Sequence, residues 1–432
     1  MSARPLLIRN GRIIDPTQRL DERLDIRIVE GAVAQIGQGL EAAEAAVFDA
    51  TDCIVSPGFI DLHVHLREPG GEHKETIASG ARAAAASGFT AVCAMPNTDP
   101  PIDDPATVGY VRAAGLRSGG ARVYPVGAVS IRQKGERLTE IGEMVEAGAV
   151  AITDDGQPVA NAGLMRLALE YTQSFGIPVA NHCEDKSLSR GGSMNEGLVS
   201  TRLGLSGMPN AAEDVMIARD LLLAELTGGR LHIQHVSTRH GVELIRQAKA
   251  RGVRVSAEAT PHHFSLTDEA VEGYRTEAKV NPPLRAEPDR LAVLEGVRDS
   301  TLDVIATDHA PHHYDEKEQA FEDAPFGLVG LETALGLALT RLVEPGLLDF
   351  TGLIDRMSCG PARAFGLPGG TLKAGTPADL TVFDPAAEWV VDRSRFLSKS
   401  RNTPFAGWTL RGKVRLTVVG GTIVWQLHAQ QP

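Results

Sequence analysis

A short apolar run followed by a helical pattern recurs along the middle of the chain, and this alternation constrains the fold more than any other feature. The apolar runs are 59–66, 90–95, 123–129, 149–153, 178–182, 231–236, 253–259 and 303–307. Helical patterns separate most of them, at 75–87, 105–117, 138–147, 161–175, 211–226, 240–251 and 288–299. Eight such units predict an α/β fold of the (β/α)8 TIM-barrel type. A doubly wound sheet is the alternative, but no Gly-x-Gly-x-x-Gly follows the first run, which disfavours it.

Both ends of the chain instead show short alternating runs typical of antiparallel strands. They are 6–8, 11–14, 25–29 and 32–36 at the amino end, and 378–383, 414–419 and 421–425 at the carboxy end. Neither end has enough strands to bury a core alone. We therefore expect residues 1–56 and 366–432 to form one small β-sandwich domain, with the barrel, residues 57–365, inserted between them.

Composition excludes several classes of protein. The 43 basic and 55 acidic residues give a formal charge of −12, which argues against nucleic-acid binding and against adhesion to an anionic membrane surface. The four cysteines are scattered without a Cys-x-x-Cys, so neither a disulfide framework nor a thiolate zinc site is expected. No stretch approaches the ~18 apolar residues of a membrane span. These features predict a soluble protein of the reducing cytoplasm.

The carboxyl ends of the predicted strands carry many residues that can bind metal ions. His63 and His65 stand two apart at the end of the first run, so both side chains face the same way, and Arg67 follows on that face. Taken alone, this pair could be two histidines on a half-exposed strand. Similar residues, however, stand at the ends of five later runs: Asp154, Asp155, His182, Glu184, His235, His262, His263, Asp308 and His312. Because active sites of such barrels lie at this end, the set predicts a metal centre.

The chemistry of these side chains narrows the choice of metal. Histidine and carboxylate ligands without thiolates suit zinc, with manganese or cobalt as substitutes. The set is large enough for two ions that share a carboxylate and together activate a water molecule.

Seven segments of the central region form a recognisable combination: 61–70 (DLHVHLREPG), 95–98 (MPNT), 154–156 (DDG), 182–185 (HCED), 234–237 (QHVS), 279–285 (KVNPPLR) and 307–312 (TDHAPH). Together they resemble the amidohydrolase superfamily, and more closely the bacterial class I dihydroorotases. The metal ligands that this resemblance implies are His63, His65, Asp155, His182, His235 and Asp308.

The resemblance implies that His63, His65 and Asp308 hold a first zinc ion. It favours two bound ions over one. Asp155 takes the bridging place that a carboxylated lysine fills in hydantoinases, dihydropyrimidinases and allantoinases. The absence of that lysine after the fourth run favours dihydroorotase over these cyclic amidases. On the residues alone, Asp154 remains the alternative to Asp155, because adjacent strand residues face opposite ways.

The resemblance also implies the reaction. It is the reversible hydrolysis of L-dihydroorotate to N-carbamoyl-L-aspartate in pyrimidine biosynthesis, with Asp308 as the catalytic base and then acid. The substrate contacts that it implies are Arg67, Asn97, Asn281, His312 and Gly327. Asn281 could otherwise be a plain turn residue. The charged segment 313–327 follows these residues and is either a mobile cover over the site or an exposed connection.

Two other functions remain open at this point. One is a related cyclic amidase acting on hydantoin, dihydropyrimidine or allantoin. The other is a catalytically weak barrel that supports aspartate transcarbamoylase, with which some relatives assemble. The expected partners are therefore a small-molecule substrate, a second copy of the chain in a homodimer and, in some settings, that transcarbamoylase.

Overall fold

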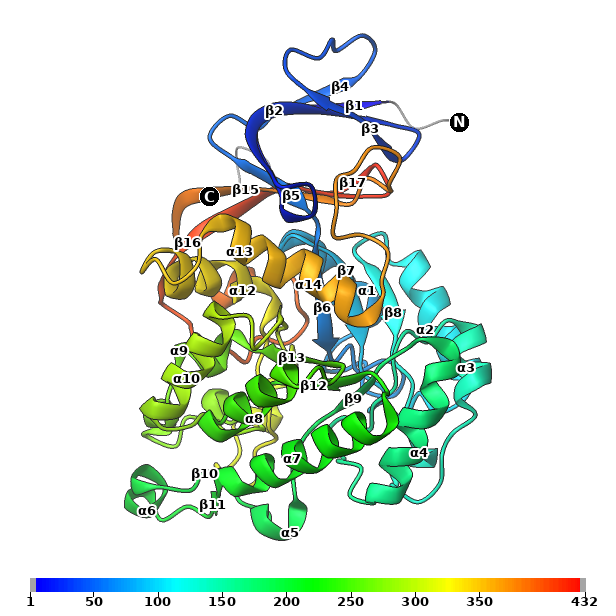
Figure 1. Ribbon diagram of the computed structural model, residues 1–432. Coiled ribbons are helices and arrows are strands. Elements are labelled where there is room, and N and C mark those ends of the chain that lie inside the picture. The colour runs from blue at the N-terminus through cyan, green and yellow to red at the C-terminus, as the bar shows by residue number, and fades with distance from the viewer. Residues whose placement is uncertain (1–4, 428–432) are drawn as a thin grey trace.

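A computed structural model of the protein describes residues 5–427 and contains a barrel with a β-sheet unit above it (Figure 1). Seven barrel strands have regular pairing: β6 (Phe59–Val64), β7 (Phe89–Ala94), β8 (Arg122–Pro125), β9 (Val179–Asn181), β12 (Leu231–Ile233), β13 (Val255–Ala259) and β14 (Val304–Ile305). They form two parallel sheets, β6-β7-β8 and β9-β12-β13-β14.

Short parallel bridges join these two sheets into a ring. Ile152 pairs with Gly127 on one side and Val179 on the other, so the segment around it fills the place of the fourth strand. Val64 pairs with His309, which closes the ring between β14 and β6. The predicted (β/α)8 barrel is therefore confirmed, with all eight strands at the positions expected from the apolar runs.

Ten helices of the described residues surround the barrel, and the first seven lie close to their predicted positions, whereas the last three had no predicted range. They are α1 (Ile77–Ala86), α2 (Pro105–Arg117), α3 (Ile141–Ala147), α4 (Ala162–Thr172), α7 (Asn210–Thr227), α8 (Arg239–Ala250), α10 (Glu287–Arg298), α12 (Leu331–Ala338), α13 (Phe350–Ile354) and α14 (Gly360–Phe365). Capping side chains determine where several of these helices begin. Thr76 accepts from Ser79 N in a capping box, and Asp104 caps α2 just before Pro105.

Short elements interrupt the regular alternation at the carboxyl ends of the strands. They are α5 (Lys186–Ser189), β10 (Met194–Asn195), α6 (Leu198–Leu203), β11 (Gly207–Met208), α9 (Pro261–Ser265) and α11 (Tyr314–Lys317). The predicted pattern did not include them, because elements of two to six residues carry too little periodicity to be recognised.

The two ends of the chain form one hydrogen-bonded sheet. Its strands are β1 (Leu6–Asp15), β2 (Leu20–Val29), β3 (Ala32–Gly37), β4 (Ala46–Asp49), β5 (Ile54–Pro57), β15 (Leu380–Val390), β16 (Thr409–Val419) and β17 (Thr422–Gln426). The order is β17-β16-β15-β5-β1-β2-β3, with β4 also on β1. The sheet bends so that β1 and β2 lie over β15 and β16 (Figure 1). Ile13 and Ile26 thereby share a buried cluster with Val382 and Leu416.

We propose that this sandwich-like unit comprises residues 1–56 and 366–432, as the sequence predicts. Two features support the division. Gly58 separates β5 of the sheet from β6 of the barrel, and Gly366 ends α14 with a positive φ of 69°.

One long connection of the sheet returns to the barrel. Residues 391–408, between β15 and β16, pack Phe396 and Phe405 against Val329 and Leu337. The sequence did not predict this contact, which brings the carboxy-terminal part of the chain next to the last barrel strand.

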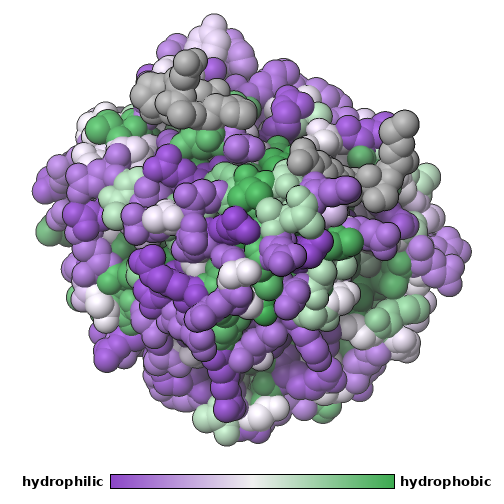
Figure 2. All heavy atoms as spheres, turned by 90° about the horizontal axis from the view of Figure 1, so that it is seen from above, coloured by the Kyte–Doolittle hydropathy of each residue, from purple (hydrophilic) through white to green (hydrophobic). Residues whose placement is uncertain are grey.

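The surface on the side of the β-sheet unit is mainly hydrophilic, with small hydrophobic patches between charged side chains (Figure 2). Among the helices of residues 5–427, none combines the length and the apolar character that crossing a membrane requires.

Candidate metal centre and active site

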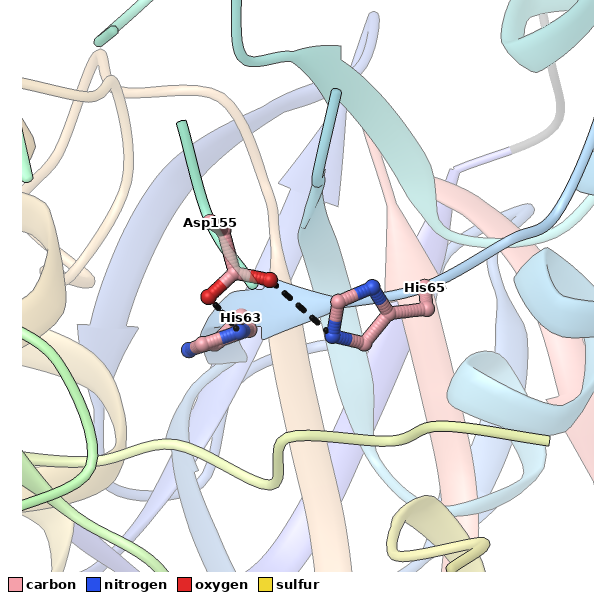
Figure 3. A group of neighbouring side chains, drawn as sticks. All are labelled: His63, His65 and Asp155. Carbon is pink, nitrogen blue, oxygen red and sulfur yellow. Dashed lines mark ion pairs between the residues drawn. The ribbon is translucent and has the colours of Figure 1, made fainter. Parts of the chain in front are cut away.

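The end of β6 brings two histidines to one carboxylate. His63 Nε2 lies 3.4 Å from Asp155 Oδ1, and His65 Nε2 lies 3.5 Å from Asp155 Oδ2 (Figure 3). Asp308 Oδ1 lies 3.0 Å from His65 Nε2 and 3.5 Å from His63 Nε2. Ligands bound to one tetrahedral zinc ion at about 2.0–2.1 Å stand about 3.4 Å apart. These four side chains are therefore spaced to surround one ion.

A second group uses the same carboxylate. His182 Nδ1 and His235 Nε2 lie 3.9 and 3.7 Å from Asp155 Oδ1, and 2.9 Å from each other. Asp155 thus belongs to both groups of candidate ligands. Its neighbour Asp154 turns the other way and accepts hydrogen bonds from the backbone and hydroxyl of Ser130. The structure therefore brings together all six residues predicted as metal ligands and leaves Asp154 outside.

Buried atoms in these groups fit a metal ion. His63 Nε2 and Asp155 Oδ1 are buried and have no hydrogen-bond partner in the structure. Such atoms are costly unless a partner compensates for lost hydration, and a cation between them would do so. Burial raises the pKa of Asp155 and of Asp308, but nearby histidines, His63 first among them, outweigh burial and hold both pKa values well below their usual range. Both side chains are therefore carboxylates, the form that binds metals.

Other buried groups orient the candidate ligands. The Glu258 carboxylate, on β13, lies 2.6 Å from His63 Nδ1 through Oε1 and 3.0 Å from His232 Nε2 through Oε2. Burial raises the pKa of Glu258, and the two histidines lower it to about 2. Asn97 Oδ1 lies 2.8 Å from His65 Nδ1. In both cases the outer ring nitrogen is occupied, which leaves Nε2 to face Asp155.

A partly buried cation lies near these groups. Arg67 donates from Nε to Pro311 O at 3.1 Å, and its Nη2 lies 3.1 Å from His312 Nε2. Burial lowers the pKa of Arg67 to about 10, so it stays charged at neutral pH, whereas burial and Arg67 depress the pKa of His312 and keep it neutral. Within residues 5–427, Arg67 forms no ion pair with a carboxylate. Its charge is therefore available to an anionic ligand.

The other two predicted substrate contacts lie on loops, Asn281 beside Glu184 and Gly327 beside His312. Asn281 Nδ2 donates to Glu184 Oε2 at 3.1 Å, and the Asn281 side chain is partly exposed. Gly327 has a φ of 130°, and a Cβ there would lie 2.7 Å from Ala310 Cβ and 3.2 Å from His312 Cδ2. Only glycine fits there without moving His312.

Backbone strain is concentrated at the site. Arg67, His235 and Asp308 have φ values of 60°, 32° and 47°, in the left-handed region that side chains other than glycine seldom adopt. Such strain persists where surrounding contacts over-determine a conformation, which is common in functional sites.

The segment after His312 is tightly anchored. Lys317 is buried, and its Nζ donates to Pro325 O at 2.8 Å and to Gly327 O at 3.0 Å. Lys279 Nζ donates to Phe321 O at 2.7 Å. Lys317 therefore ties the segment 313–327 to itself, and Lys279 ties it to the loop that carries Asn281. That the segment acts as a mobile cover stays a prediction.

Sequence reasoning missed three supporting residues. Glu258 carried a signal, because it is a charged residue inside an apolar run. Glu184 was counted among the residues that can bind metal ions, but its contact with His182 was not predicted. Asn402, whose Oδ1 accepts from His312 N at 3.0 Å, carried none, because 90 residues separate the two positions.

Comparison with known proteins agrees with this geometry. Residues 52–241 match the family model described as Dihydro-orotase-like. The chain is 56% identical to the dihydroorotase of Pelotomaculum thermopropionicum over 98% of both chains. It is 54% identical to the dihydroorotase of Geobacter metallireducens, over 98% of this chain and 99% of that protein.

Solved structures show the same fold with lower sequence similarity. The L-hydantoinase (dihydropyrimidinase) of Arthrobacter aurescens has a TM-score of 0.88 and 28% identity, and the match covers 98% of this chain and 96% of that one. The dihydropyrimidinase of Brevibacillus agri has a TM-score of 0.83 at 22% identity over 98% and 95% of the chains, which bears on the fold alone. The identity to dihydroorotases is about twice as high and spans the whole barrel and the terminal sheet, so the chain is an enzyme of the dihydroorotase family.

Proposed function

We propose that this enzyme interconverts L-dihydroorotate and N-carbamoyl-L-aspartate, using two zinc ions. The observation that carries this proposal is the partly buried Arg67, which lacks a carboxylate partner within residues 5–427 but lies near enough to Asp308 and Asp155 for both carboxylates to act on its pKa. A cyclic amide that bears its own carboxylate satisfies both features, because one end needs a cation and the other a polarised carbonyl.

His63, His65 and Asp308 would hold one ion, and His182 and His235 the other, with Asp155 between them. The two ions would supply Lewis acidity toward the ring carbonyl and acidify a water molecule. Asp308 is buried and ionised, so it can accept a proton from the attacking water and return it to the ring nitrogen that leaves.

The substrate would be held at its two ends. Arg67 donates to the substrate carboxylate, and Asn97 adds the Nδ2 hydrogens that His65 does not use. His312 and the backbone of Gly327 would close this end, while Asn281 would contact the ring amide.

Proton balance sets the direction of the reaction. Hydrolysis turns a monoanion into a dianion and releases one proton, because the new carboxylic acid ionises at neutral pH. Ring closure is therefore favoured at lower pH, by about tenfold in the equilibrium ratio for each pH unit.

The test measures zinc per chain together with hydrolysis, for the wild type and for Asp155→Ala. We expect about two zinc ions and ready turnover in the wild type, and a loss of zinc with turnover reduced at least ~10³-fold in the variant. Dihydrouracil, hydantoin and allantoin are assayed in parallel. Faster turnover of any of these rings than of dihydroorotate would contradict the proposal.

We further propose that the enzyme works in the cytoplasm as a homodimer and associates with aspartate transcarbamoylase where that partner is present. Light scattering of the purified chain, alone and mixed with the transcarbamoylase, tests both assemblies. A monomer that gains neither mass nor activity on mixing would refute them.

A further inference from the structure

Glu184 lies between a candidate metal ligand and a candidate substrate contact. Its Oε2 lies 3.1 Å from His182 Nε2 and accepts a hydrogen bond from Asn281 Nδ2, also at 3.1 Å. Its other oxygen, Oε1, accepts from the hydroxyl of Ser189. The side chain is nearly buried, with 9% of the residue exposed. One carboxylate oxygen therefore holds two residues that belong to different parts of the site.

The contact determines how His182 is presented. His182 faces Asp155 and His235 through Nδ1, so Nε2 is the nitrogen that carries hydrogen and donates it to Glu184. A histidine whose outer nitrogen is bonded to a carboxylate keeps one tautomer and one ring orientation, and is a more basic ligand.

The same oxygen determines how Asn281 is presented. An asparagine amide has two N–H hydrogens and one carbonyl oxygen. One hydrogen is donated to Glu184, so the amide cannot flip, and the second hydrogen and Oδ1 remain for another partner. His263 Nε2 lies 2.9 Å from Pro282 O, which anchors the adjoining backbone, so the Asn281 side chain has little freedom.

A parallel arrangement exists at the first group of ligands. Asn97 bonds directly to His65, through Oδ1 and Nδ1 at 2.8 Å. Each asparagine that is predicted to contact substrate is thus tied to a different group of metal ligands. Asn97 is tied directly, and Asn281 is tied through Glu184.

We propose that Glu184 is a positioning residue that couples metal binding at His182 to substrate binding at Asn281. The proposal rests on the proposed function for its substrate half. Because both hydrogen bonds end on one oxygen, the distance between the ring amide and the second metal position is set by Glu184. Loss of the Glu184 charge therefore weakens metal binding by His182 and, at the same time, weakens the hydrogen bond that orients Asn281.

The experiment uses Glu184→Gln, which keeps the shape of the side chain but removes its charge, so that the oxygen shared by His182 and Asn281 becomes a neutral and weaker acceptor. Zinc release is followed with a coloured chelator, and kcat and KM for dihydroorotate are measured at saturating zinc. We expect one of the bound ions to be held about 10–100-fold more weakly. We also expect KM to rise by about tenfold, with a smaller change in kcat.

Asn281→Ala and the double variant separate coupling from two independent effects. If Glu184 acts on substrate through Asn281, the KM of the double variant equals that of Asn281→Ala. Asp185→Asn is the matched control, because this neighbouring carboxylate accepts from Ser187 at the start of α5 and contacts neither His182 nor Asn281. It should keep both zinc retention and KM.

Zinc retention in Glu184→Gln equal to that of the wild type would overturn the proposal, as would KM effects that multiply in the double variant. Wild-type protein that binds zinc but does not hydrolyse dihydroorotate would instead refute the proposed function. If Glu184→Gln fails to fold, Ser189→Ala removes only the support of Oε1, and we then expect the same paired changes at about one-third of their size. Unchanged zinc retention and KM in Ser189→Ala would overturn the proposal in that case.

Discussion

Replacing Asn402 should damage the active site from a distance. Asn402 lies in the connection between β15 and β16, and its side chain is buried against the segment that follows β14. Oδ1 accepts from His312 N at 3.0 Å, and Nδ2 donates to Gly327 O at 3.1 Å. The Asn402 carbonyl accepts from Val329 N at 2.9 Å. One residue of the terminal part therefore holds both sides of the loop that carries His312.

The size of the effect follows from what each partner loses. In Asn402→Ala, the buried N–H of His312 has no acceptor, which costs about 1–3 kcal/mol. Gly327 O keeps the hydrogen bond from Lys317, so losing the hydrogen bond from Asn402 costs about 1 kcal/mol or less. We expect the free energy of unfolding to fall by about 2–3 kcal/mol. Because His312 is then less well placed, we expect kcat/KM for dihydroorotate to fall by about tenfold, mainly through KM.

Urea unfolding and steady-state hydrolysis measure the two effects in the same preparations. Ser400→Ala is the matched control, because Ser400 lies in the same connection but donates to Lys74 O at 2.7 Å, away from His312. It should lose about 1 kcal/mol of stability and keep KM. The reasoning is refuted if Asn402→Ala keeps the wild-type KM, or if Ser400→Ala raises KM as much.

Two further changes probe the cations Lys317 and Arg67 near the site. Burial and Lys279 lower the pKa of Lys317 to about 7, so above pH 7 the unfolded chain binds more protons than the folded one. Stability should therefore rise with pH, by about 2 kcal/mol between pH 7 and 9 from this group. Lys317→Met should remove that rise in urea unfolding, and equal pH slopes in both proteins would contradict the assignment. Arg67→Met should lower kcat/KM at least ~10²-fold for dihydroorotate but little for dihydrouracil, which lacks the carboxylate. Equal losses for the two rings would show that Arg67 does not select the carboxylate.

The barrel could be predicted because its signals are local. Each strand is an apolar run of about five residues, and several helices have their own caps, such as Thr76 for α1 and Asp104 for α2. Parallel strands of a closed barrel then place all their carboxyl ends together, so His63, His182 and Asp308 meet without further information. Distances along the chain do not matter for such residues, since the fold alone brings them to one end.

The contacts of residues 391–408 could not be predicted in the same way. This connection has no regular periodicity, and its position depends on side chains such as Phe396 and Phe405 that find pockets on the barrel. Nothing in the sequence around Asn402 distinguishes a buried asparagine with three partners from a turn residue. The short elements α5 and α11 escaped prediction for a related reason, because tertiary contacts stabilise them and local propensity does not.

The site residues were predicted with one role each, although the polar side chains have more than one polar atom. Asn97 was expected to contact substrate, yet its carbonyl oxygen is bound to His65 and only its amide hydrogens remain. His63 was expected to bind metal, yet its other nitrogen is held by Glu258. A sequence motif names the side chain that faces the ligand, but a buried imidazole or amide needs a partner for every polar atom. Three residues of the site are accordingly held from behind, His63 by Glu258, His182 by Glu184 and His312 by Asn402.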